Sequence, residues 1–270
     1  MDIFKTIIEV LDAHMTVPTP FGWFHLMWIA IMFVGMFLLC YTHKKGDDKR
    51  VRKVVFITAI LVTVLEIYKQ INFSFTINED KIVFDYQWYA FPFQFCSMPI
   101  YVGLLTGIFK KGKIHDALFA FLATYSIFGG MTVMVYPPQV FVGAIGINIQ
   151  TMFCHASMIA VGVYLLYTEY VKVEHKTILK AMAVFTVAMA IAMILNEVGN
   201  AIGLNGGNDT FNMFYISPYC TPTLPVYSIL QGILPYPVCI VIYYLGFNLI
   251  AYLILLAAIG LKRLGKNKKD

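Results

Sequence analysis

Seven long apolar stretches dominate the chain and restrict it to folds that cross a membrane. Each is long enough to span the hydrocarbon layer of a bilayer, which takes about 20 apolar residues in a helix. The stretches cover residues 22–42, 51–73, 92–109, 114–135, 145–168, 177–198 and 236–261. Of all residues, 59% are hydrophobic and only 13% are charged, unlike the average soluble domain. The sequence therefore predicts an all-α, polytopic membrane protein with seven transmembrane helices.

The positions of lysine and arginine indicate how these helices are oriented. Of the 20 basic residues, 17 fall in four of the segments between or after the apolar stretches: 43–53, 110–113, 172–180 and 262–269. Because cytoplasmic loops carry an excess of Lys and Arg, we expect the N-terminus outside and the C-terminus in the cytoplasm. The expected location is the cell membrane, which is the cytoplasmic membrane if the host is bacterial. The net charge of +5 then reflects topology, and no binding of nucleic acid is expected.

The first 20 residues have a pattern of their own. Three apolar residues recur there at helical spacing, and two prolines follow: Ile3, Ile7, Leu11, Pro18 and Pro20. This pattern predicts a short amphipathic helix on the outer surface within residues 1–20, with a frayed terminus as the alternative. Residues 21–270 are predicted to form a single transmembrane domain. Its external segment 199–235 is rich in Gly, Asn and Pro, which suits a structured lid or a partly re-entrant segment.

Four polar residues lie at nearly the same depth in four of the predicted helices. The depth is counted in residues from the first cytoplasmic charge on each helix. Cys96, His155 and Asn248 lie 14 residues deep, and Glu66 lies 13 residues deep. At about 1.5 Å rise per residue, all four are roughly 20 Å up a layer about 30 Å thick. Polar and ionisable groups are costly inside a bilayer, so each of them is a candidate for a functional site.

Cys96 and His155 are the residue types of an activated nucleophile. Cys96 follows Pro92, which suits the first turn of a helix entered from outside. The positive end of a helix dipole favours a thiolate, and an imidazole at the same depth can act as its base. Packing is the alternative for both residues: a small buried hydrophobe for the cysteine and a hydrogen-bonded structural side chain for the histidine.

Several amides are candidates for substrate-binding or supporting roles. Gln94 lies two residues before Cys96, and Asn148 shares a helix face with His155, so both are candidate donors to an oxyanion. Asn248 belongs to the polar layer at mid-depth. Asn196 marks the outer end of its helix, where solvation alone can account for it.

Two further ionisable residues are assigned supporting roles. Glu66 either forms a self-neutralising pair with Lys69, three residues further on, or orients His155 or another donor. His25 lies near the outer boundary and is expected to line the entrance to the site. The five cysteines show no spacing typical of zinc ligands, so neither a metal nor a cofactor is expected.

Four short motifs resemble the YwaF family of bacterial integral membrane proteins. They are Phe91-Pro-Phe-Gln-Phe-Cys-Ser97, Gln150-x-x-x-x-His155, Asn212-Met-Phe214 and Leu234-Pro-Tyr-Pro237. That family is similar to a eukaryotic transmembrane phospholipid acyltransferase, and more remotely to the androgen-induced-gene hydrolases of fatty acid esters. The resemblance implies that Cys96 attacks a lipid ester to form a thioester, with His155 as the base. The closing segment of relatives is richer in tryptophan and carries a basic residue, whereas this chain differs there. If that segment helps to hold the head group of the lipid, the identity of the head group is left undetermined.

Three functions remain open at this point. The first is a lipid acyltransferase acting through a Cys96 thioester, with membrane lipids as substrate. The second is a lipid ester hydrolase that uses the same residues and passes the acyl group to water. The third is a transporter for a small solute or protons, with the polar layer as its binding site. The sequence does not indicate an oligomeric state.

Overall fold

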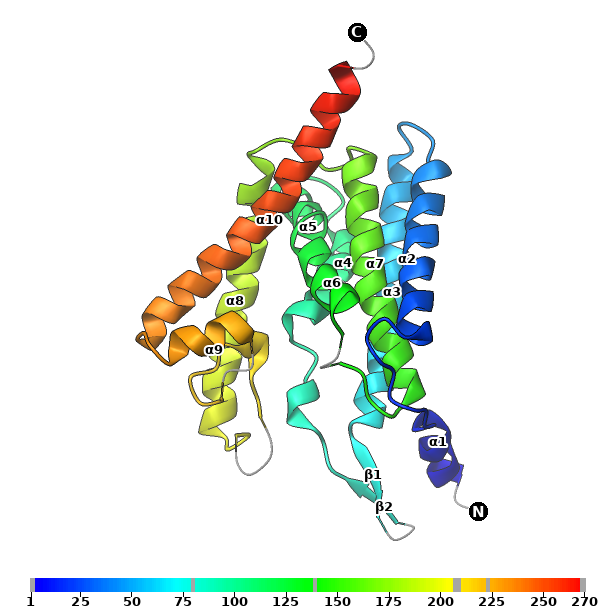
Figure 1. Ribbon diagram of the computed structural model, residues 1–270, viewed down its shortest axis with the longest axis vertical. Helices are drawn as coiled ribbons and strands as arrows, with labels where there is room; N and C mark the ends of the chain where they lie inside the picture. The colour runs from blue at the N-terminus through cyan, green and yellow to red at the C-terminus, as the bar shows by residue number, and fades with distance from the viewer. Residues whose placement is uncertain (1–2, 79–80, 138–139, 206–209, 222–223, 268–270) are drawn as a thin grey trace.

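The computed structural model of the chain describes residues 3–78, 81–137, 140–205, 210–221 and 224–267. It is a bundle of helices with the N-terminus at one end and the C-terminus at the other (Figure 1). The helices are α1 (Ile3–Leu11), α2 (Trp23–Tyr41), α3 (Asp48–Asn72), α4 (Met98–Ile108), α5 (Lys113–Leu122), α6 (Tyr125–Val135), α7 (Ile145–Tyr167), α8 (Thr177–Ala201), α9 (Pro225–Gln231) and α10 (Tyr236–Asn267). Three single 3₁₀ turns also occur: η1 (Trp88–Ala90), η2 (Phe95–Ser97) and η3 (Met213–Tyr215).

Among the described residues, six helical segments are long and apolar enough to cross a membrane. They correspond to six of the seven predicted stretches, which confirms a multi-pass, mainly helical membrane protein. Inside a bilayer only such helices satisfy every backbone group internally. The predicted stretch 92–109 forms a shorter apolar helical run, Phe95–Ile108. Seven crossings and the outside N-terminus therefore remain predictions.

Helix α4 begins later than the sequence suggests. It starts at Met98, with Pro99 in its first turn, rather than at about residue 92. The preceding residues are irregular because their polar groups bond to another loop, as described below. Cys96 consequently lies in the 3₁₀ turn η2, directly before the N-terminus of α4.

The centre of the bundle is formed by α5, α6 and α7. In the segments Lys113–Val135 and Ile145–Tyr167, 72% and 67% of the spanning residues are buried, against 22% to 33% in the other four. Two glycines allow the close packing of α6 and α7. A Cβ at Gly130 would lie 2.6 Å from the carbonyl oxygen of His155, and one at Gly162 would lie 2.4 Å from a side-chain carbon of Ile127. Small residues at such contacts let helix backbones approach.

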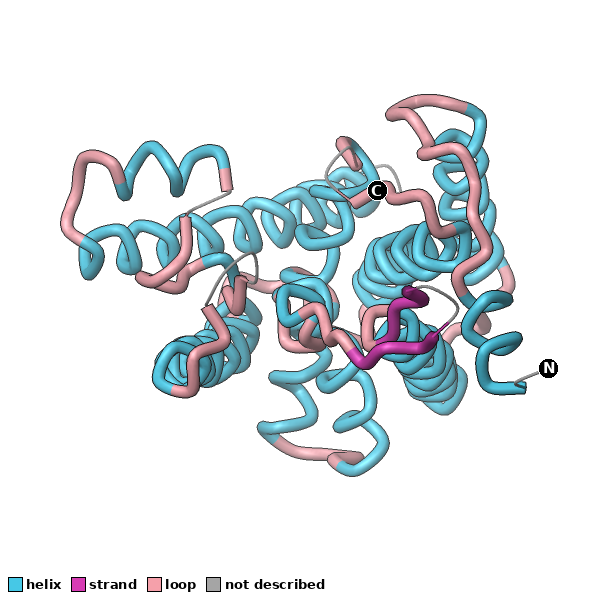
Figure 2. Tube along the Cα trace, turned by 90° about the horizontal axis from the view of Figure 1, so that it is seen from below, coloured by secondary structure: helices cyan, strands magenta, loops and turns pink. Residues whose placement is uncertain are grey.

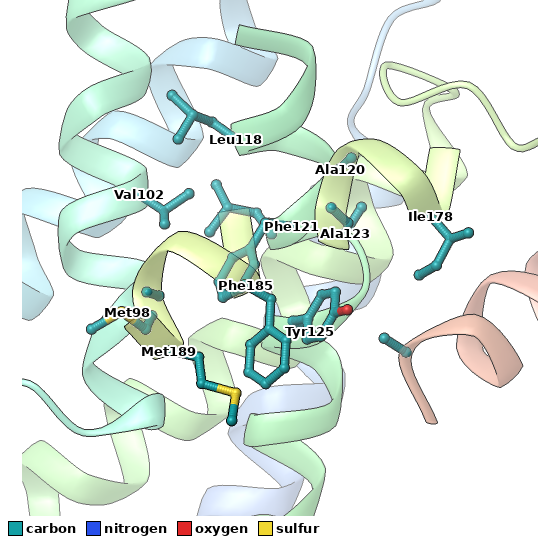
Figure 3. Close-up of a cluster of buried hydrophobic side chains, with 14 of the residues drawn as sticks. Met98, Val102, Leu118, Ala120, Phe121, Ala123, Tyr125, Ile178, Phe185 and Met189 are labelled. Atoms are coloured by element: carbon teal, nitrogen blue, oxygen red, sulfur yellow. The ribbon is translucent and has the colours of Figure 1, made fainter. Parts of the chain in front are cut away.

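The largest buried cluster is rich in aromatic rings. Phe121 of α5, Tyr125 of α6 and Phe185 of α8 stack face to face, with centroids 5.2 Å and 4.9 Å apart along the series, and Figure 3 shows them together. The break between α5 and α6 allows this arrangement because Thr124 leaves the helical conformation, with φ −130° and ψ −70°. The single apolar stretch 114–135 gave no sign of this break.

The end of the bundle that holds the N-terminus also carries the hairpin of β1 (Phe75–Asn78) and β2 (Lys81–Phe84). The strands are antiparallel, with Phe75 opposite Phe84 and Asn78 opposite Lys81. Seen from that end, the strands lie in front of the helix ends (Figure 2).

The expected helix within residues 1–20 is α1, which ends at Leu11 and so stops before the two prolines. Its outward residues include Ile3, Ile7 and Val10, which suits an amphipathic helix. The segment after it pairs with the loop before α7. Met15 N donates to Gly143 O at 2.7 Å, and Ile145 N donates to Ala13 O at 2.9 Å.

Candidate functional site

Cys96 lies in an irregular segment that passes through the body of the protein. The segment is anchored by the side-chain amide of Gln94, which donates to Asn212 O at 2.9 Å and accepts from Phe214 N at 3.0 Å. Two loops distant in sequence are thus joined by one amide. Cys96 is a free, partly buried thiol beside the positive end of the α4 dipole.

The partner loop is the segment 211–217, which is almost fully buried. Asn196 of α8 holds it by two bonds to a single residue, donating to Met213 O at 3.1 Å and accepting from Met213 N at 2.7 Å. Phe214 and Tyr215 both have φ of +58°, a left-handed conformation that is costly for bulky residues. Within the segment 199–235, residues 211–217 are structured; whether they act as a lid or re-enter the membrane stays a prediction.

His155 is buried in α7, and one of its ring nitrogens is available. Nδ1 lies 2.7 Å from the carbonyl oxygen of Thr151, which can only accept a hydrogen bond. The proton is therefore assigned to Nδ1, and Nε2 keeps its lone pair. Among the described residues Nε2 has no hydrogen-bond partner, although it is buried. A fixed imidazole with one free nitrogen is the usual form of a general base.

The segment that carries Cys96 packs against the helix that carries His155. Cys154 Sγ lies 3.8 Å from Cys96 O, one residue before the histidine. Met158 lies one turn further along α7. Its side chain and that of Phe95 both approach Gly129 of α6: a Cβ built at Gly129 would lie 2.7 Å from Met158 Cε and 3.0 Å from Phe95 Cε1. The two segments therefore meet; their common depth in the membrane stays a prediction. Because Nε2 has no partner, no hydrogen bond joins it to the thiol.

Glu66 is the centre of a buried polar network between α3 and α7. Its carboxylate accepts from Lys69 Nζ at 2.9 Å, from Gln70 Nε2 at 2.8 Å and from Gln150 Nε2 at 3.0 Å. Thr151 Oγ1 in turn donates to Gln150 Oε1 at 3.3 Å. The pairing with Lys69 is confirmed, and the connection to His155 is indirect.

Sequence reasoning missed the roles of Gln70 and Gln150 in this network. The motif Gln150-x-x-x-x-His155 was the only signal for Gln150. The network continues to the loop after β2, where Tyr86 donates to Gln70 Oε1. Burial raises the pKa of Tyr86 to about 12, and the nearby Glu66 carboxylate and Tyr101 add to this effect. The Tyr86 hydroxyl therefore keeps its proton and remains a donor.

The structure gives the predicted amides definite partners. Asn148 accepts from Val142 N at 3.0 Å and donates to Val142 O at 2.7 Å, so it holds the turn before α7. Asn248 accepts from the Tyr125 hydroxyl and donates to Tyr244 O. Asn196 is not a solvated helix end but a buried anchor of the loop 211–217.

His25 does not line an entrance, because it is completely buried. Phe21 N donates to its Nδ1 at 2.9 Å, and its Nε2 lies 3.0 Å from Met134 O. Both ring nitrogens are thus occupied, in contrast to those of His155.

No metal site is indicated in the described part of the chain. It contains no group of three or more His, Cys, Asp or Glu side chains placed to hold a metal ion.

Replacing Asn196 by alanine is expected to destabilise the protein. The change leaves Met213 N without its partner, and Met213 O keeps only the bond from Ile216 N at 3.4 Å. An unpaired buried group costs about 1–3 kcal/mol. Thermal unfolding in detergent micelles measures the effect. Asn200→Ala, one turn further along α8 and exposed, should leave the melting temperature nearly unchanged. Equal melting temperatures for the two variants would show that the loop 211–217 does not depend on Asn196.

Comparison with protein families places the chain in a known family. A model of the TMEM164 family matches residues 20–258, which is nearly the whole bundle. Neither the curated proteins nor the solved structures contain a match.

Proposed function

The chain belongs to the TMEM164 family, and from that premise we propose that it is a membrane-embedded lipid acyltransferase acting through a thioester on Cys96. The proposal makes Cys96 the nucleophile and His155 the general base and acid. It includes a topology of seven crossings in which α4 is the short third one, with the N-terminus outside. Membrane lipid esters are the proposed substrates because the site is reached through apolar walls.

The observation that carries the proposal is the free Nε2 of His155. A buried polar atom normally has a hydrogen-bond partner, and an exception calls for an explanation. Here Nδ1 is fixed by Thr151 O, and the α7 segment with the histidine packs against the turn with Cys96. With the imidazole held in this way, Nε2 can accept the thiol proton once rotation of the Cys96 side chain brings the thiol to it.

The reaction proceeds in two balanced steps. In the first, the proton of the Cys96 thiol moves to His155 Nε2, and the thiolate attacks the ester carbonyl carbon. The ester C–O bond breaks, the leaving oxygen takes the proton from His155, and a thioester remains. In the second, His155 removes a proton from an acceptor hydroxyl, and the hydroxyl oxygen attacks the thioester carbonyl carbon. The C–S bond breaks, and the Cys96 sulfur takes the proton from His155, which restores the thiol. With water as the acceptor, the same steps give a hydrolase.

Support for the developing negative charge comes from the N-terminus of α4. Helix N-termini carry free N–H groups and a partial positive charge, which favour both a thiolate and an oxyanion. The bonds of Gln94 and Asn148 to loop backbone favour an anchoring role for these amides, rather than the oxyanion role suggested by their positions in the sequence.

The test is to trap the acyl-enzyme. The full chain is reconstituted in nanodiscs of phosphatidylcholine, quenched in acid, and analysed by mass spectrometry of the intact protein and its peptides. We expect one acyl group, released by hydroxylamine, on the peptide that contains Cys96. Cys40→Ala should keep the adduct, and Cys96→Ala should abolish it. An adduct that survives in Cys96→Ala, or that never forms, overturns the proposal. Adding a lysophospholipid distinguishes the two second steps: transfer yields a diacyl lipid, and hydrolysis yields free fatty acid.

A further inference from the structure

A groove of about 410 Å³ opens on the side of the bundle, between α3, the β hairpin and α4. This volume is within the range of small-molecule sites, which are mostly apolar with a few polar groups. The groove is lined by Thr63, Glu66, Ile67, Gln70, Ile71, Ser74, Phe75, Phe84, Pro92, Ile100, Tyr101 and Leu104. It is referred to below as the α3–α4 groove.

The surroundings of the α3–α4 groove are those of a membrane-facing surface. Ile67 and Phe84 on its rim are 55% and 70% exposed. Only 22% of the spanning part of α3 is buried within the protein, so its outward face contacts lipid in a membrane. The material that meets this opening is therefore the acyl region of the bilayer.

The length of the groove corresponds to one leaflet. The part of α3 that lines the groove, from Thr63 to Ile71, advances eight residues, which is about 12 Å at the rise of a helix. The hydrocarbon layer is about 30 Å thick, so one leaflet contributes about half of that. The helical wall of the groove is thus comparable in length to the depth of one leaflet.

The groove adjoins the segment that carries Cys96, although neither Cys96 nor His155 lines it. Pro92 and Ile100, which line one wall, flank Cys96 in the chain. On the opposite wall lies Glu66, whose carboxylate also bonds to Lys69 and Gln150. Glu66 therefore separates the apolar groove from the polar network that leads to His155.

We propose that the α3–α4 groove binds one acyl chain of a glycerolipid from the hairpin-side leaflet, with the ester region beside Glu66, Gln70 and Ser74. The proposal deepens the proposed function and rests on it for the fate of the bound ester. Lipid enters sideways from the membrane, and the chain lies along Ile67, Ile100 and Leu104. Water cannot compete for the apolar length of the groove. The side chains of Gln70 and Ser74 already donate within the protein, so the polar end of the groove offers acceptor oxygens, to which a glycerol hydroxyl can donate.

The test uses photoreactive lipid and a matched pair of variants. Nanodiscs of phosphatidylcholine contain a fraction of the same lipid with a diazirine on one acyl chain, and cross-linked peptides are quantified by mass spectrometry. Ile67→Trp fills the groove. Val64→Trp places the same side chain on the same helix, at a residue that is 58% exposed and does not line the groove. Both sites are exposed, so both variants should fold. Leu104→Trp is a second filling variant, on the opposite wall.

We expect labelling of the α3 and α4 peptides to fall several-fold in Ile67→Trp and in Leu104→Trp, and to stay unchanged in Val64→Trp. Equal labelling in all variants, or an equal loss in Val64→Trp, overturns the proposal. All variants are also made in the Cys96→Ala chain, which cannot form the thioester. If the groove is labelled in the Cys96→Ala chain but the natural chain forms no acyl-enzyme, only the proposed chemistry is refuted. If the natural chain forms the thioester but the groove is not labelled, only the groove proposal is refuted.

Discussion

Replacing His155 by alanine is expected to slow formation of the Cys96 thioester by about 10²–10⁴-fold, the usual contribution of a general base. The reason is that Nε2 is the nitrogen left free when Thr151 O holds Nδ1. The rate of acyl-enzyme formation in phosphatidylcholine nanodiscs measures the effect, with the reaction quenched in acid at successive times. The melting temperature should change little, because the ring makes only one hydrogen bond.

His25 is the matched control for this prediction. It is buried like His155, but both of its ring nitrogens are bonded to backbone groups. His25→Ala should therefore lower the melting temperature, because it removes the bond to Phe21 N and the bond to the carbonyl of the buried Met134. It should leave the rate per folded molecule unchanged. If both alanine variants form the thioester at the natural rate, His155 is not the base.

Replacing Glu66 by leucine is expected to reduce the free energy of unfolding by about 3–5 kcal/mol, the cost of breaking a buried ion pair by removing one partner. Lys69 then keeps its charge without a counterion, and Gln70 and Gln150 lose their common acceptor. Denaturant titration in detergent micelles measures the change. The double variant Glu66→Gln with Lys69→Met removes both charges and should recover most of the loss.

An exposed ion pair of similar length provides the comparison. Lys180 Nζ lies 2.8 Å from Asp116 Oδ2, but the two side chains are 42% and 48% exposed. Pairs of this kind contribute about 0–1 kcal/mol because water and salt screen them. Lys180→Met should therefore have a small effect. If Glu66→Leu is as mild as Lys180→Met, the network does not stabilise the contact between α3 and α7.

The positions of the helices along the chain could be predicted because the membrane imposes one strong rule. Apolar length sets where a helix can cross, and the six spanning segments begin and end within a few residues of the predicted stretches. The exceptions are places where tertiary contacts act on the backbone. The bonds of Gln94 to the loop 211–217 keep residues 91–97 out of α4, and Thr124 interrupts the stretch 114–135. Apolar length carries no information about the contact of Gln94 or about the break at Thr124.

The sequence could predict which segments of the candidate site lie together, but not the directions of their side chains. Counting residues from the charged ends placed Cys96 and His155 on segments that do pack together. The same count cannot say which way a side chain faces around the bundle, so His25 was wrongly assigned to an entrance. It also cannot separate a catalytic amide from one that anchors a loop, because the two differ only in their partners.

The pairing between residues 13–15 and the loop before α7 has a practical consequence for handling the protein. The backbone bonds of this pairing join the N-terminal segment to Gly143 and Ile145, where the helix with His155 begins. Tyr68 of α3 adds a hydrogen bond to Leu11 O at 2.6 Å. A fusion partner at the N-terminus would pull on this junction, whereas the C-terminal end of α10 projects away from the bundle (Figure 1). Affinity tags and fluorescent reporters therefore belong at the C-terminus.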